Sequence, residues 1–72
     1  MHALAQTVVD AVKNGKLDRE SCLERIEEME RVANNNKAVK PFNSPAELFA
    51  CCDEIRVALN LPVNNIPKRI WS

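Results

Sequence analysis

The chain has 72 residues, with 10 Lys and Arg against 10 Asp and Glu, so its net charge at neutral pH is zero. This length provides one domain, and the balanced charge removes the electrostatic argument for nucleic-acid binding that a strongly basic domain offers. The single glycine disfavours a sheet built from tight hairpins, and an apolar content of 46% is ordinary for a globular protein. We therefore expect one all-α domain over residues 1–72.

Residues 3–14 are predicted to form the first helix. Leu4, Val8 and Val12 recur every four residues, a spacing that places them on one helix face. Gly15 follows shortly afterwards, and glycine favours the left-handed conformation that ends many helices. We expect this helix to turn an apolar face to the core and to stop before Gly15.

A second helix is predicted over residues 19–33, with Asp18 as its N-cap. Glu27 and Arg31 are spaced for a favourable i,i+4 pair on its charged side. Because only a few residues join this helix to the first, we expect the two to lie antiparallel as a helical hairpin. The apolar positions follow a spacing of four, three and four, and they are Cys22, Ile26, Met29 and Ala33.

The third predicted helix, residues 44–60, has a clear start signal. Ser44 is its N-cap, Pro45 takes the first helical position, and Glu47 completes a capping box. Pro62 ends it, because proline cannot continue a helix. This helix is more apolar around its circumference than a surface helix needs to be. Its main apolar set is Leu48, Cys51, Cys52, Ile55 and Leu59, and its second set is Phe49, Val57 and Leu61.

These elements predict a small three-helix bundle, in which the third helix packs across the hairpin and residues 61–72 form a short tail or turn. The side chains expected in its core are Leu4, Val8, Val12, Leu23, Ile26, Met29, Leu48, Ile55 and Leu59.

The second apolar set of the third helix needs a cover. Three short helices cannot cover both sets, so either the tail or another chain must cover the second one. The tail contains a basic pair followed by Ile70 and by Trp71, the only tryptophan. Trp71 either folds back over the core or serves as an exposed anchor, since Trp and Arg are over-represented at binding hot spots. The residues expected to bind a partner are Phe49, Val57, Lys68, Arg69, Ile70 and Trp71.

The sequence contains no recognisable catalytic or metal-binding constellation. His2 is the only histidine, so a Cys–His dyad would need the N-terminus to fold back. The three cysteines lack the spacing of a zinc site, and their odd number does not suit a secreted disulfide framework. We expect a non-catalytic protein without cofactor or metal, with reduced thiols and a cytoplasmic location. No stretch approaches the ~20 apolar residues of a membrane span.

Residues 58–71 suggest an alternative function in DNA binding. Their order resembles the centre of a helix-turn-helix motif, in which a helix ends and Asn60 makes the turn. Lys68 and Arg69 would reach phosphates. Pro67, however, lies in what would be the recognition helix, and base readout needs several side chains on one helix. A small DNA-binding regulator is the alternative hypothesis, and it rests on this helix-turn-helix order and on Lys68 and Arg69.

Aromatic, basic and apolar residues near the C-terminus form a further pattern, made of Phe49, Arg56 and Ala58 and then, after a gap, Ile66, Pro67, Ile70 and Trp71. This pattern resembles the Hha/YmoA family of small helical modulators of bacterial nucleoid proteins. The loop 34–43 has no counterpart in the resemblance. The resemblance implies binding to a nucleoid-structuring protein rather than to DNA alone.

The leading expectation is a small protein-interaction module, such as a regulator, inhibitor or adaptor of a larger bacterial or phage protein. We expect a protein partner or self-association, and no membrane association. A homodimer that uses Phe49, Val57 and Trp71 fits the same residues equally well.

Overall fold

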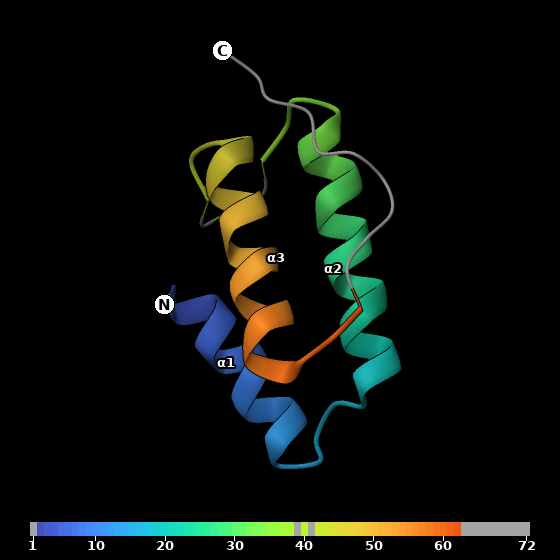
Figure 1. The fold of residues 1–72 in the computed structure, drawn as a ribbon. Helices are drawn as coiled ribbons and strands as arrows, with labels where there is room; N and C mark the ends of the chain where they lie inside the picture. Colours follow the sequence, from blue (N-terminus) through green and yellow to red (C-terminus); the bar gives the residue numbers. More distant parts are fainter. Residues whose placement is uncertain (1, 39, 41, 63–72) are drawn as a thin grey trace.

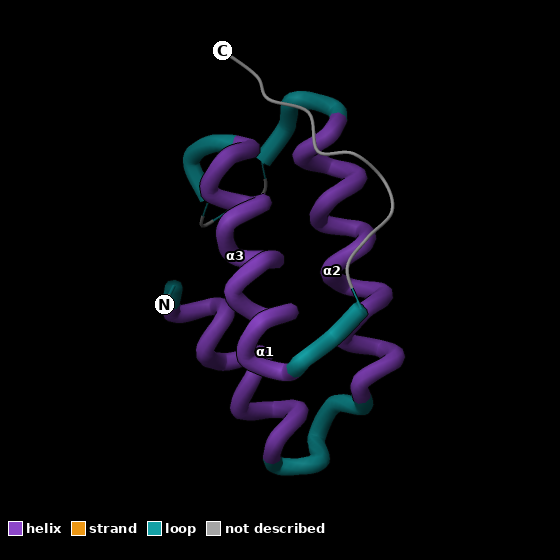
Figure 2. Tube along the Cα trace, in the orientation of Figure 1, coloured by secondary structure: helices purple, strands orange, loops and turns teal. Residues whose placement is uncertain are grey.

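The computed structural model describes residues 2–38, 40 and 42–62 of the chain. Within these residues the structure consists of helices, turns and loops and has no strand (Figure 2). Each helix runs opposite to the one before it, and together they form a small bundle (Figure 1). This is the all-α architecture that the sequence predicts, and each boundary lies within one residue of its expected place. The helices are α1 (Ala3–Lys13), α2 (Arg19–Asn34) and α3 (Pro45–Leu59).

Side-chain caps fix the starts of α2 and α3 at the positions that the sequence indicates. The Asp18 carboxylate accepts a hydrogen bond from the Ser21 backbone N–H at 2.6 Å, and this bond holds the pKa of Asp18 below its ordinary value. Ser44 Oγ accepts from the Glu47 N–H at 3.2 Å, and Glu47 Oε2 accepts from the Asn43 N–H at 2.8 Å. The predicted capping box therefore forms, with its reciprocal bond one residue before Ser44.

The three described helices end in the same way, at a residue with a left-handed backbone. Gly15, Asn36 and Asn60 have φ angles of 75°, 59° and 53°. After α1, the Lys16 N–H donates to the Ala11 carbonyl oxygen at 2.9 Å, and an equivalent bond closes each of the other two helices. This is the Schellman motif, which satisfies carbonyl groups that the last turn leaves open.

These left-handed positions give opposite expectations for two substitutions. Gly15→Ala should lower the free energy of unfolding by about 1 kcal/mol, because an L-residue is strained at a φ of 75°. The loss is conformational, since a Cβ atom at Gly15 would meet no atom within 4 Å. Asn60→Gly should keep or raise stability by up to about 0.5 kcal/mol, because it relieves the same strain. Urea unfolding followed by circular dichroism measures both, and equal losses would contradict this account of the helix ends.

α3 is the helix that holds the bundle together. It packs against both α1 and α2, whereas α1 and α2 contact each other much less. The two connected helices run antiparallel, as the sequence predicts (Figure 1). α3 packs against each of them, but because α1 and α2 contact each other little, α3 does not lie across a tightly packed hairpin. The reason is that α3 is apolar on more than one side. Its most deeply buried side chains are Leu48, Cys51, Cys52 and Ile55.

The core matches the prediction on α3 and differs from it on α1 and on part of α2. The buried residues of α1 are Ala5 and Val9, at 0% and 2% exposed. The larger Leu4 and Val8 instead line a space that they share with residues of α2. Among the predicted core residues, Ile26, Leu48, Ile55 and Leu59 are buried, and Leu4, Val8, Val12, Leu23 and Met29 are half-buried.

Two apolar side chains outside the helices complete the core. Phe42, from the loop before α3, is 5% exposed, and Leu61, just after α3, is 8% exposed. The ring of Phe42 lies 4.7 Å from the ring of His2, measured between centroids. His2 also caps α1, since its Nδ1 accepts a hydrogen bond from the Leu4 N–H at 3.1 Å. The imidazole therefore has a structural role at the start of α1.

A buried ion pair joins α2 to α3. Glu30 is 2% exposed and Arg56 is 6% exposed, and Arg56 Nη1 donates a hydrogen bond to Glu30 Oε2. Arg56 Nε also donates to the Pro62 carbonyl oxygen at 2.9 Å, whereas Nη2 has no acceptor among the described residues. Burial alone would lower the pKa of Arg56, but the bond to Glu30 and its negative charge outweigh burial and raise it. Arg56 thus fixes α2, α3 and the segment after α3 together.

Breaking this pair on one side should cost more than removing it. Glu30→Leu should lower the free energy of unfolding by about 3 kcal/mol, because it leaves the Arg56 guanidinium buried without its counter-charge. Adding Arg56→Met should recover part of that loss, since no isolated charge then remains. Urea unfolding of the two single variants and the double variant measures the coupling. Additive losses would show that the two side chains act independently.

Candidate docking surfaces

An apolar groove lies between α1 and α2. It encloses about 300 Å³, and Ile55 of α3 contributes to its lining. The groove exists because α1 and α2 pack mainly on α3 and leave a space between themselves. Its other lining residues are Leu4 and Val8 from α1 and Cys22, Arg25, Ile26, Glu28 and Met29 from α2.

The groove combines buried and accessible apolar side chains. Ile26 and Ile55 are 0% exposed, whereas Leu4, Val8 and Met29 are half-buried. The half-buried side chains are already partly desolvated and still accessible, so a partner's apolar side chain would bury them further. The sequence predicts that all five of these side chains lie in the core. Helical spacing identifies an apolar face, but it does not predict how closely two helices approach each other.

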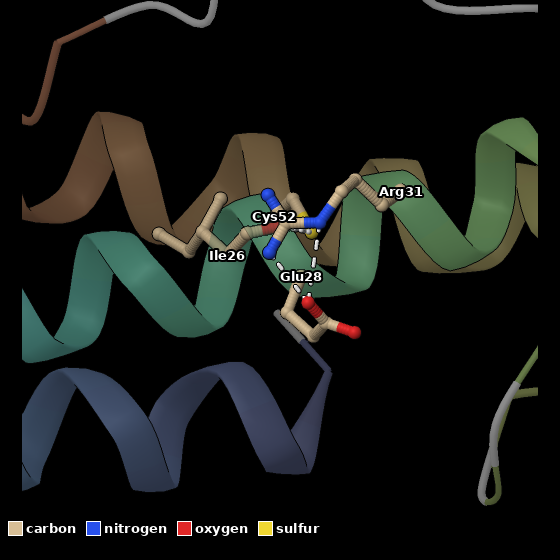
Figure 3. A network of polar contacts seen from close by, with 4 residues as sticks. All are labelled: Ile26, Glu28, Arg31 and Cys52. Carbon is tan, nitrogen blue, oxygen red and sulfur yellow. Dashed lines mark hydrogen bonds and ion pairs between the residues drawn. The ribbon is translucent and has the colours of Figure 1, made fainter.

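Two charged residues of opposite sign line the same groove on α2. Arg25 and Glu28 are both exposed and lie three residues apart. Figure 3 shows that Glu28 also meets Arg31, whose Nη2 and Nε donate to Glu28 Oε2 at 2.5 Å and 3.2 Å. The predicted partner of Arg31 was Glu27, and the direct hydrogen bonds go to Glu28 instead. The pair is exposed, so it adds little to stability.

The outer face of α3 is the second candidate surface. Val57 is 84% exposed, which makes it the exposed large hydrophobic side chain of the described residues. Asp53, Glu54 and Ala58 surround it in an open hollow of about 480 Å³. Glu54 Oε2 accepts a hydrogen bond from the His2 backbone N–H at 3.1 Å, which ties this face to the start of α1. Val57 is therefore accessible, and its expected role in binding a partner stays a prediction.

Phe49 is buried, at 8% exposed, so something covers this member of the second apolar set. Its expected role in binding a partner stays a prediction. Phe49 precedes Arg56 by seven residues and therefore shares the side of α3 that faces α2. Of the second apolar set, Leu61 is buried as well, and Val57 alone remains exposed. The other expected partner-binding residues, Lys68, Arg69, Ile70 and Trp71, lie outside the described residues.

A third hollow, of about 580 Å³, lies beside the turn between α1 and α2. Arg19 lines it, but the guanidinium is used by the fold. Arg19 Nη1 donates to the Leu59 carbonyl oxygen at 2.6 Å, and Nη2 donates to the Asn60 carbonyl oxygen at 3.1 Å. These bonds satisfy the end of α3 and attach it to the start of α2. This hollow is therefore not a candidate site.

The three cysteines lie inside the bundle as free thiols. Cys22, Cys51 and Cys52 are at most 1% exposed, and Cys52 Sγ lies 3.8 Å from the Ile26 carbonyl oxygen (Figure 3). Burial raises the pKa of each thiol, that of Cys52 to about 12. Among the described residues, no group of three or more His, Cys, Asp or Glu could hold a metal ion.

No family model, curated protein or solved structure matches this chain. The resemblance to the Hha/YmoA family therefore rests on its own residues. Of these, Phe49, Arg56 and Ala58 lie on α3, while the residues from Ile66 onwards lie outside the described part. The same holds for most of the helix-turn-helix pattern, of which the left-handed turn at Asn60 is observed. No helix in the described ranges is long and apolar enough to cross a membrane.

The buried thiols give a direct test of the core. At pH 8, a pKa of about 12 in place of 9.0 leaves Cys52 with a thiolate fraction about a thousandfold smaller than that of an ordinary cysteine. We expect a disulfide reagent to modify Cys22, Cys51 and Cys52 slowly in the native protein and rapidly in urea. Mass spectrometry of the labelled peptides assigns each site. Fast native labelling of any of the three would contradict its burial.

Proposed function

We propose that the protein is a small non-catalytic interaction module, which binds an apolar helical segment of a larger protein in the groove between α1 and α2. The observation that carries the proposal is the groove itself, an accessible space of about 300 Å³ whose lining is apolar except for Arg25 and Glu28. Such a space is small for a substrate site, and its lining lacks several convergent polar groups. It suits apolar side chains of a partner protein better than a polar small molecule.

The expected partner segment is an amphipathic helix. Two helices flank the groove, and a third helix can lie along them and insert side chains spaced by three or four residues, as in other helix-in-groove interfaces. Leu4 and Val8 on α1 and Met29 on α2 would contact these side chains from the two sides. Methionine adapts its shape readily, which suits a docking surface.

Arg25 and Glu28 add orientation to this apolar contact. They carry opposite charges within one turn of α2, and Glu28 already pairs with Arg31, so a partner with an acidic residue placed to meet Arg25 would favour one direction of binding. These charges favour one register of the bound helix, while the apolar side chains supply most of the affinity.

The proposal includes a regulatory or adaptor role in the cytoplasm. Three reduced thiols in one small core are typical of proteins from a reducing compartment. A module of this size acts by occupying a surface of its partner.

The test compares Val8→Asp with Thr7→Asp, because these neighbours on α1 are both β-branched and receive the same charge. Val8 lines the groove, whereas Thr7 is exposed and does not line it. The immobilised variants are incubated with nuclease-treated native lysate, and the affinity of a protein captured by the unmodified chain is then measured by calorimetry. Val8→Asp should weaken binding at least about 30-fold, as expected for a hot-spot side chain, and Thr7→Asp should not.

Circular dichroism checks that both variants keep their helices. A partner that binds equally to Val8→Asp contradicts a groove interface. Captured material that disappears on nuclease treatment also contradicts it and supports the DNA-binding alternative. Equal weakening by Thr7→Asp would show that the charge, and not the groove, decides binding.

A further inference from the structure

The groove between α1 and α2 carries its two charges in a fixed order. On α2, Arg25 comes first and Glu28 follows three residues later, and both side chains are exposed where they line the groove. A rise of 1.5 Å per residue separates them by about 4.5 Å along the helix axis. A fully complementary ligand therefore presents an acidic group beside Arg25 and a basic group beside Glu28.

Both charged groups can accept such a partner. Arg25 makes no hydrogen bond and no ion pair within the described part of the chain. Glu28 pairs with Arg31, but both hydrogen bonds from that guanidinium end on Glu28 Oε2 (Figure 3). Among the described residues, no hydrogen bond ends on Glu28 Oε1, so this oxygen remains for a second donor.

The helix α2 is complementary to itself when a second copy runs antiparallel beside it. Reversal places Glu28 of the second copy opposite Arg25 and Arg25 of the second copy opposite Glu28. One two-fold axis thus gives two identical ion pairs. A segment with a single sign of charge would satisfy only one of the two groups. The order of charges in the groove therefore favours a second copy over a segment of uniform charge.

The apolar lining suits the same arrangement. Ile55 of α3 is 0% exposed and closes one side of the groove, while the accessible apolar side chains come from α1 and α2. Two α1–α2 layers that face each other form a four-helix bundle, with α2 beside α2, α1 beside α1 and each α3 outside. The side chains that each copy would bury on the other are the half-buried Leu4, Val8 and Met29.

The size of the chain adds a reason for such a contact. A domain of about 60–70 residues buries only about 60% of the surface that its unfolded chain exposes. Oligomerisation is one of the ways in which domains this small gain stability. A second copy in the groove adds apolar burial without any further segment of the chain.

We propose that a second copy of this chain occupies the groove while the partner segment is absent, with the two α1–α2 layers packed about a two-fold axis and Arg25 of each copy paired with Glu28 of the other. This dimer regulates the site of the proposed function, on which it rests, because the partner segment and the second copy compete for the same apolar side chains. Binding of the partner therefore dissociates the dimer.

Sedimentation of the full chain tests the charge pairing. The unmodified protein should pass from monomer to dimer as its concentration rises to about 1 mM. Arg25→Glu alone and Glu28→Arg alone should each weaken dimerisation at least about tenfold, since like charges then face each other. A mixture of these two variants should form a heterodimer, because all facing charges are then opposite, and the chain with both substitutions should again form a homodimer. Recovery on mixing is a result that a merely damaged fold would not give.

The matched control for the charge variants is Glu24→Arg. Glu24 is exposed on α2 and does not line the groove, so this variant should dimerise like the unmodified chain. Val8→Asp tests the apolar contact, and it should weaken dimerisation at least about 30-fold, whereas Val57→Asp on the outer face of α3 should not. The urea midpoint of the unmodified chain should rise with protein concentration, and that of Val8→Asp should not. Circular dichroism checks that each variant keeps its helices.

Three outcomes would overturn the proposal. The unmodified chain would be a monomer at every concentration. Alternatively, the mixture of Arg25→Glu and Glu28→Arg would stay monomeric. Lastly, Val57→Asp would break the dimer and Val8→Asp would not, which would assign the dimer to the outer face of α3.

The results separate this proposal from the proposed function. A monomer in sedimentation leaves the calorimetric comparison of Val8→Asp with Thr7→Asp intact, so only the dimer is then rejected. A captured protein that binds Val8→Asp as well as the unmodified chain rejects the groove as the partner site. In that case the dimer observed in sedimentation still stands, but it no longer competes with the partner.

Discussion

The ion pair between Glu30 and Arg56 is the interaction on which the arrangement of the molecule depends. Both side chains are almost fully buried, and removal from water costs each charge several kcal/mol that only the mutual pairing and further hydrogen bonds offset. The pair therefore tolerates one placement of α2 on α3. Since Arg56 also bonds to the Pro62 carbonyl oxygen, the same placement fixes where the chain leaves the bundle. Arg56 of α3 therefore contacts both α2, through Glu30, and the segment after α3, through Pro62.

The groove follows from this constraint. α1 also packs on α3, and the buried side chains of α1 are the small Ala5 and Val9. The larger Leu4 and Val8 then lie beside that contact and line a space that α2 does not fill. The apolar residues of a single helix thus serve two purposes. One pair attaches α1 to the bundle, and its neighbours remain partly accessible, so the surface available for a partner is a by-product of how the core is built.

The signals that predict this fold are local, and the features that escape prediction are tertiary. Asp18, Ser44 and Gly15 mark helix ends within a few residues of sequence, because capping depends on neighbouring backbone groups. The burial of Glu30 has no such signal: in a helix with many acidic residues it resembles a solvated side chain, and only its meeting with Arg56 makes burial possible. Similarly, Phe49 and Val57 look alike in sequence, yet Phe49 is 8% exposed and Val57 is 84% exposed.

The two apolar surfaces have a thermodynamic cost that bears on their role. A domain of about 60–70 residues buries only about 60% of the surface that its unfolded chain exposes, so its stability is small. Filling the groove or covering Val57 would each add apolar burial of the kind that stabilises such a domain. Their chemistry also differs, since the groove is apolar with both signs of charge and the α3 face is acidic. The groove and the outer face of α3 therefore differ in the chemistry that they offer to a ligand.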